Sequence, residues 1–278
     1  MTVSTMGFLV PPAPWTAAIA GVASKAIILV HGDGAAISIV GARRNMDSRA
    51  FCLDAGFPEM AKAASEAGAT ASWDGKTLRS GSAVADAGSA LAWDPRDRLA
   101  AGAAPAGLGT AIKATRAALM EARAAGRTKE GIHGDGPFAA GFRRLRAEAG
   151  FPASIVGFGP GSTPAGDDWL AGYLCGKDLV AGGPGRGARD LRAEIGRRLD
   201  RTTPAGRALL AGAMAGAPPE YIVELALAAA STERTEGRVH ETVLAALGHG
   251  ATSGEDAIAG FVEALAERLA DGTVTALL

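Results

Sequence analysis

The chain has 278 residues, and 48% of them are hydrophobic, so it can form one large domain or two smaller ones around a sizeable core. Its 28 basic and 29 acidic residues give a net charge of −1, which argues against nucleic-acid binding and against a polybasic membrane surface. No apolar run reaches the ~18 residues of a membrane span, and the first residues lack a basic region followed by an apolar stretch, so we expect no signal peptide. The two cysteines, Cys52 and Cys175, match no metal spacing. We therefore expect a cytoplasmic protein with reduced cysteines.

The first hundred residues have a sequence pattern typical of strands and turns. Residues 25–30 and 35–40 are short apolar runs on either side of a glycine-containing turn, and they predict a hairpin. Residues 69–73 and 76–79 flank an Asp-Gly pair, which predicts a second hairpin. This part is expected to be a β-rich, hairpin or barrel-like domain.

The periodicity changes to that of helices at about residue 108. Glycine, proline and threonine bound each helical segment. The pattern predicts an α+β protein with a β-rich domain over residues 1–105 and a helical domain over residues 106–278. The predicted helices cover residues 109–125, 137–149, 165–180, 187–200, 204–215, 219–230, 236–247 and 255–271.

An internal repeat lies within the helical part. The segment GFGPGSTPAGDDWLAG at residues 157–172 is followed by GHGATSGEDAIAG at residues 248–260. When residues 165–172 are aligned with residues 253–260, both share the pattern small-Gly-acid-Asp-x-aliphatic-Ala-Gly. A weaker copy at residues 203–212 lacks the acids. We expect helices with equivalent starts, and we expect the acidic pairs to meet at one site.

The first copy has the features of an anion-binding helix start. Thr163 and Pro164 suit the N-cap and first positions of a helix, and the glycines before them allow a ligand to approach the backbone closely. Free amides and the positive helix end favour an anion there. The motif is not a phosphate-binding P-loop, because no Gly-Lys-Ser/Thr follows, and it lacks the Rossmann context.

Asp167 and Asp168 would repel a phosphate unless a cation lies between them and it. Adjacent helical residues point about 100° apart, so Asp167 and Asp168 cannot easily chelate one ion. If the two copies face each other, Asp168 and Asp256 can bind Mg²⁺ through oxygen ligands. The last copy also has a simpler explanation, since Thr252 and Glu255 form a capping box.

The first copy resembles the signature of the DUF2877 family, Gly-x-Gly-x-Gly-Leu-Thr-Pro-Ser-Gly-Asp-Asp-Phe-Leu-x-Gly, which includes the AllH-type subunit of oxamate carbamoyltransferase. This chain has Ser162, Ala165 and Trp169 where the signature has Leu, Ser and Phe. The resemblance implies carbamoyl transfer between oxamate and carbamoyl phosphate in purine (allantoin) catabolism, together with protein partner subunits.

From the residues and the resemblance we expect a transferase subunit that binds a small anionic substrate. Two rivals remain at this stage: a stand-alone Mg²⁺-dependent phosphate-ester or acyl-phosphate enzyme, and a non-catalytic ligand-binding or scaffold subunit. No organic cofactor is indicated. The candidate catalytic residues are Asp168, Asp167 and His249. The candidate metal ligands are Asp168 and Asp256. The candidate anion-binding residues are Gly159, Gly161, Ser162, Thr163, Gly166, Thr203, Ser253 and Gly254.

Overall fold

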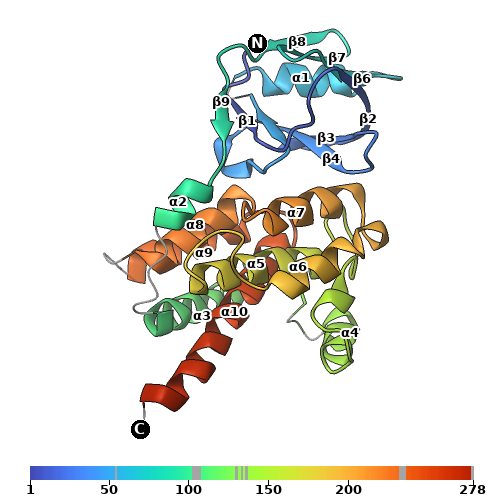
Figure 1. Cartoon of the computed structure of the whole chain (residues 1–278). Helices are drawn as coiled ribbons and strands as arrows, with labels where there is room; N and C mark the ends of the chain where they lie inside the picture. Colours follow the sequence, from blue (N-terminus) through green and yellow to red (C-terminus); the bar gives the residue numbers. More distant parts are fainter. Residues whose placement is uncertain are drawn as a thin grey trace. The chain divides into compact units, whose positions relative to one another are not determined.

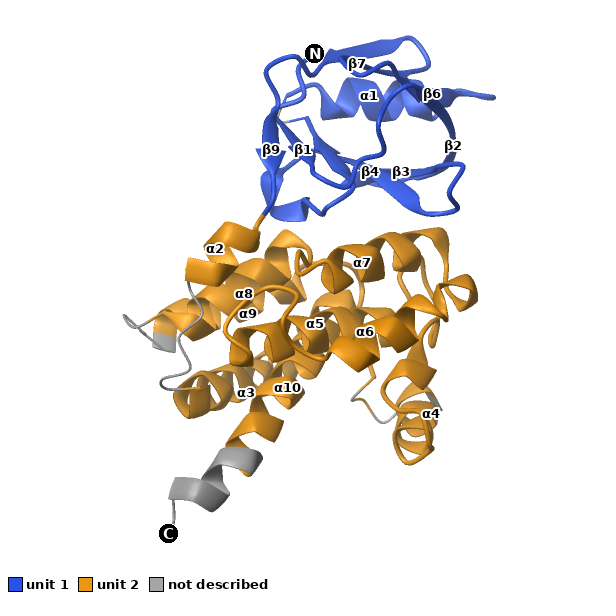
Figure 2. Ribbon diagram, viewed as in Figure 1, with its two compact units in different colours: residues 1–94 blue, residues 95–278 orange. Residues whose placement is uncertain are grey.

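The computed structural model divides the chain into two compact units, Met1–Asp94 and Pro95–Leu278 (Figure 2). The first unit is built on a β-sheet and the second on helices, which confirms the expected α+β class. The boundary expected between residues 105 and 106 lies outside the described residues. The structure describes residues 1–276 except positions 54, 102–107, 129–130, 133, 135–136 and 232–235.

The first unit contains a nine-stranded sheet with the order β8-β7-β6-β2-β3-β4-β5-β1-β9. Both expected hairpins are confirmed as antiparallel pairs: β3 (Ala26–Val30) with β4 (Ala36–Val40), and β6 (Thr70–Trp73) with β7 (Thr77–Ser80). The other strands are β1 (Thr5–Gly7), β2 (Trp15–Val22), β5 (Ala50–Cys52), β8 (Ala83–Asp86) and β9 (Leu91–Trp93).

The sheet is curled, as Figure 1 shows. Thr2 forms a bridge to Asp86 at the end of β8, which links the start of the chain to the far edge of the sheet. Helix α1 (Phe57–Ala64) covers the interior of the curl and contributes Met60 to the same hydrophobic core as Phe51. The sequence interpretation did not include this helix.

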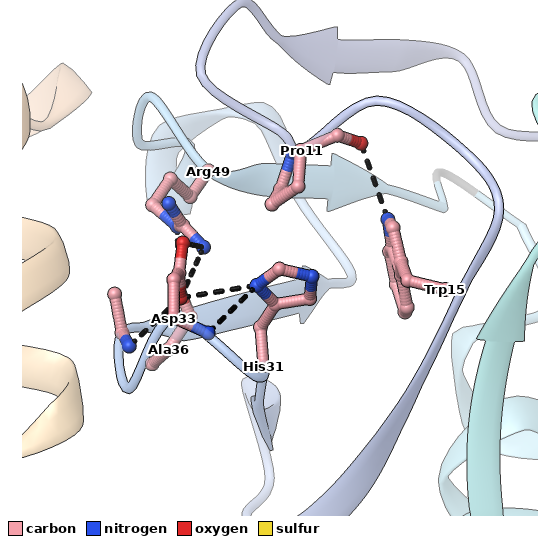
Figure 3. Close-up of polar contacts among 7 residues, drawn as sticks. Pro11, Trp15, His31, Asp33, Ala36 and Arg49 are labelled. Atoms are coloured by element: carbon pink, nitrogen blue, oxygen red, sulfur yellow. Dashed lines mark hydrogen bonds and ion pairs between the residues drawn. The ribbon is translucent and has the colours of Figure 1, made fainter.

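The connection between β3 and β4 is held by a buried arginine from the start of β5 (Figure 3). The Nη2 atom of Arg49 lies 2.9 and 3.2 Å from the two carboxylate oxygens of Asp33, and its Nε donates to the Ala36 carbonyl at 2.9 Å. His31 lies beside Asp33, and its ring meets Trp15 edge-on at 5.9 Å. The cluster fixes the turn by satisfying its polar groups internally.

Helix α5 (Ala165–Val180) is the central helix of the second unit (Figure 1). Nearly all of its residues are buried, and α7, α8 and α10 pack against it. A helix that is apolar on all sides is expected in such a position. The remaining helices are α2 (Arg96–Ala101), α3 (Leu108–Ala124), α4 (Pro137–Arg146), α6 (Arg189–Gly196), α7 (Pro204–Met214), α8 (Glu220–Ala230), α9 (Glu236–Leu247) and α10 (Ser253–Ala276).

The two copies of the repeat pack directly on each other through their last glycines. A Cβ atom on Gly172 of α5 would lie 1.9 Å from the carbonyl oxygen of Ala257 in α10. A Cβ atom on Gly260 of α10 would lie 2.0 Å from the carbonyl oxygen of Trp169 in α5. The contacts are reciprocal, because Gly172 aligns with Gly260 and Trp169 aligns with Ala257. The helices therefore cross backbone to backbone with a local two-fold relationship.

Candidate functional site

The glycine-rich loop at residues 157–163 adopts a backbone that favours glycine. Gly157, Gly159 and Gly161 have φ angles of 75°, 112° and 101°. Gly157 also lies so close to the Arg201 carbonyl that a Cβ would be 2.2 Å from its oxygen. Gly161 and Ser162 are exposed, and no described residue accepts a hydrogen bond from the amides of Gly159, Gly161 or Ser162. The loop thus presents free backbone donors at the surface.

Asp167 holds the glycine-rich loop in place through hydrogen bonds inside the protein. Its Oδ1 accepts a hydrogen bond from the Gly157 amide at 2.8 Å, and its Oδ2 accepts one from the Thr202 hydroxyl. The side chain is fully buried, and burial raises its pKa to about 6. Because both oxygens are engaged inside the protein, the geometry gives Asp167 a positioning role.

Thr203 fixes the loop at its other end. Its hydroxyl accepts from the Gly206 amide at 2.9 Å, as the N-cap of α7, and donates to the Ser162 carbonyl. The hydroxyl therefore accepts one hydrogen bond and donates another within the protein. Thr203 holds the loop in its conformation and does not offer its hydroxyl proton to a ligand.

Gly166 and Gly254 occupy equivalent places in the two copies, and their amides are already engaged. The Gly166 amide donates to the Phe158 carbonyl at 2.8 Å, and the Gly254 amide donates to the His249 carbonyl at 3.1 Å. Added Cβ atoms would lie 2.1 and 1.8 Å from backbone oxygens. These two glycines therefore permit close packing at the helix starts, and they do not present the amides that the anion-binding interpretation assigned to them.

The second acid of each copy has a free, buried oxygen. Asp168 is 1% exposed and Asp256 is 0% exposed, and the Oδ2 atom of each has no hydrogen-bond partner among the described residues. The Oδ1 atom of Asp256 accepts from the Ile132 amide at 2.7 Å. Of the first acids, Asp167 has both oxygens engaged, as described. Glu255 forms an ion pair with Arg123 at 2.7 Å through Oε1, and its buried Oε2 has no partner among the described residues.

The structure brings the starts of the two helices together. The hydroxyls of Thr163 and Ser253 lie 3.1 Å apart. Burial raises the pKa of Asp168 well above its ordinary value; hydrogen bonding to Ser253 opposes the rise, and the charge of Asp256 adds to it. Burial also raises the pKa of Asp256 to about 6. The two carboxyls therefore form one electrostatically coupled pair that holds protons at unusually high pH.

His249 stacks on a tyrosine that the sequence interpretation missed. The half-buried His249 ring stacks on Tyr221, with 4.1 Å between centroids and 21° between planes. Burial raises the pKa of Tyr221 well above 10, and the charges of Asp168 and Asp256 add to the rise. The only available signal in the sequence was a tyrosine at the second residue after a Pro-Pro helix start. The Ile132 amide gave no signal, because any residue can supply it.

A protein-family model matches the part of the chain that contains this site. Residues 155–265 match the family model described as oxamate carbamoyltransferase subunit AllH. Over these residues the chain is similar to the AllH-type family, and the match covers less than half of the chain. The matched stretch contains every residue that we singled out as a site candidate. No curated protein and no solved structure gives a significant match.

The matched segment offers two carboxylates to a metal ion, not a full ligand cage. Within the described ranges, no three His, Cys, Asp or Glu side chains are grouped so that they could hold a metal. Mg²⁺ commonly binds through one or two carboxylates together with water and substrate phosphates, so Asp168 and Asp256 are compatible with that mode. None of the described helices is long and apolar enough to span a bilayer.

Proposed function

We propose that this chain is a cytoplasmic subunit of a carbamoyltransferase-like enzyme, and that it binds a small anionic substrate such as oxamate or carbamoyl phosphate. One observation carries the proposal: two fully buried carboxyls, each with a free oxygen, belong to two helix starts that contact each other beside an open glycine loop, within the stretch that matches the AllH model. Burying an unpaired polar group costs stability, so such a pair is expected where a ligand completes it.

The parts of the site have complementary tasks in this proposal. The free amides of Gly159, Gly161 and Ser162 hold the anionic group of the substrate. Asp168 orients the nitrogen nucleophile, because its free Oδ2 can accept a hydrogen bond from the N–H group. Thr163, Ser253 and His249 line the approach to the carboxyl pair. Asp167 and Thr203 keep the loop in shape.

Asp168 and Asp256 would also hold Mg²⁺ when the substrate carries a phosphate. The ion would supply the positive charge that lets phosphate lie beside the two carboxyls. The description of the matched family as a subunit also supports protein partners for this chain, and we propose that they complete the enzyme.

The first test is a thermal-shift titration of the purified chain with oxamate, carbamoyl phosphate, phosphate and ATP, each with and without Mg²⁺. A ligand at 100 times its Kd adds about 2.7 kcal/mol of stability. We expect oxamate or carbamoyl phosphate to raise the melting temperature. Asp168→Asn should abolish this shift. Asp200→Asn is the matched control, because Asp200 is exposed in the same unit, and it should keep the shift.

Other outcomes decide between the rivals. A Mg²⁺-dependent shift with ATP or phosphate alone, with turnover by the isolated chain, would favour a stand-alone phosphate enzyme. No shift with any ligand, even with copurifying partners present, would contradict the proposal and leave a scaffold subunit. Turnover that requires a copurifying partner would support the transferase subunit.

A further inference from the structure

A groove lies between α10 and α3, two helices that pack against each other in the helical unit (Figure 1). On α10 it extends from Glu255 to Ala270, which is about 22 Å of helix. Its lining residues on α10 recur every three or four positions, so they form one continuous face of the helix. The apolar lining residues are mostly small and leave room for another helix to approach: Leu119, Ala259, Val262, Ala266 and Ala270.

Most charged groups that line the groove are paired within the chain. Three ion pairs account for them: Arg123–Glu255, Arg146–Glu263 and Lys177–Glu267. Two groups are left over. Arg116 of α3 is exposed, and no described residue pairs with it. Glu255 is only 5% exposed, and its Oε2 atom is buried without a partner among the described residues. The groove is therefore left with one free base and one free acidic oxygen.

The free base and the free acid are separated along the groove. Arg123, which holds the other oxygen of Glu255, follows Arg116 by seven residues on α3, or about 10 Å along the helix. Leu119 lines the groove between these two arginines. In a symmetric dimer, a contact between one residue and a second residue of the other copy occurs twice. A two-fold axis near Leu119 would therefore place each Arg116 beside the other copy's Glu255.

We propose that this groove binds a second copy of the chain, so that α3 and α10 of two helical units form a symmetric dimer. Charge complementarity selects this occupant. An acidic partner helix would neutralise Arg116 and leave the Glu255 oxygen buried without a partner, and a basic helix would do the reverse. A second copy supplies both missing groups. Met120 and Leu269, on the same two helices, are exposed large hydrophobic residues, as expected near an interface.

Sedimentation analysis of the purified full chain tests the proposal. We expect twice the mass of one chain. Leu119→Glu should give a monomer, because it places a charge at the centre of the interface. Ala117→Glu is the matched control, since Ala117 is exposed on the same helix and does not line the groove, and it should remain a dimer. Arg116→Glu changes an exposed side chain, and it should raise the dimer Kd by more than about tenfold through repulsion from Glu255.

Three outcomes would overturn the proposal. One is a wild-type chain that stays monomeric up to about 100 µM. Another is a dimer that neither Leu119→Glu nor Arg116→Glu weakens, because the contact would then lie elsewhere. The third is a monomer that loses a copurifying subunit on Arg116→Glu, because the groove would then belong to a foreign partner. The Arg116→Glu result decides the matter even if Leu119→Glu does not fold. Since mass is measured without substrate, failure here leaves the proposed function standing.

Discussion

At the residue scale, the site separates acids that hold the fold from acids that are free to act. The repeat alone treats Asp167 and Asp168 alike, since both are acidic and adjacent at a helix start. The structure engages both oxygens of Asp167 and leaves one oxygen of Asp168 free. The free oxygen of Asp168 lowers the stability of the fold because it is buried: an unpaired buried carboxylate loses its hydration without compensation.

This cost predicts a trade-off between stability and function at Asp168. Asp168→Asn replaces a buried, uncompensated acid by a neutral group of the same shape, so at pH 7 the melting temperature of the ligand-free chain should rise by a few degrees. Calorimetry of Asp168→Asn beside the exposed control Asp200→Asn checks it. A fall in melting temperature would mean that Asp168 stabilises the helix start instead.

The raised pKa values also predict how stability depends on pH. Asp256 has a folded pKa of about 6 against 3.8 in a model peptide, so the folded chain holds its proton more tightly than the unfolded chain does. Its stabilising effect is complete below pH 3.8 and is lost as the pH rises through 6, by about 3 kcal/mol at most. Urea unfolding at pH 5 and pH 7.5 should show this loss, and Asp256→Asn should reduce it. An unchanged difference between the two pH values in Asp256→Asn would contradict the assignment.

At the element scale, the helices of the site were predictable and the long-range pairings were not. The start of α7 follows from its Thr-Pro signal, with Thr203 as the N-cap, and α5 was placed at residues 165–180 as observed. The N-cap predicted for α5 was wrong, because Pro164 is the N-cap and no side chain caps this helix start. Strand β1 is three residues long and pairs in parallel with β9, which is far away in sequence. No local pattern encodes such a partner, and the same holds for the Ile132 amide that binds Asp256.

Some helices begin or end at other residues than the sequence predicts. The helix expected over residues 187–200 ends at Gly196, and a separate 3₁₀ turn (Leu199–Arg201) follows. The Arg201 carbonyl of this turn lies against Gly157, so the break helps to seat the glycine loop. Conversely, α10 starts at Ser253 rather than 255 and runs to Ala276.

The reciprocal glycine contacts between α5 and α10 give a prediction for this helix pair. Gly260→Ala would place a methyl group against the Trp169 carbonyl and force the helices apart, at a cost of about 3 kcal/mol or with failure to fold. Gly237→Ala is the matched control, since nothing lies within 4 Å of a Cβ there, and the better helix propensity of alanine should leave stability equal or slightly higher. Urea unfolding of both variants measures the difference. Equal stability of Gly260→Ala and wild type would show that the helices can shift without loss.

At the scale of the whole molecule, the candidate site residues all lie in one of the two units. The expectation of a β-rich part followed by a helical part is met, because the change from alternating to helical periodicity is visible in the sequence. The candidate site residues, from Gly159 to Asp256, belong to the helical unit. The polar cluster around Arg49 in the first unit is internally paired, so it supplies a fixed turn rather than a second centre.

This division predicts that the helical unit binds substrate without the β-rich unit. It has its own core, with Trp169, Phe142 and Phe261 fully buried, so a chain of residues 95–278 should fold and should bind oxamate with the same Kd as the full chain. Isothermal titration of residues 95–278, residues 1–94 and the full chain measures this, and residues 1–94 should show no binding. A folded helical unit with at least tenfold weaker binding would mean that the β-rich unit contributes to the site, because the carboxyl pair and the glycine loop would then be present but insufficient.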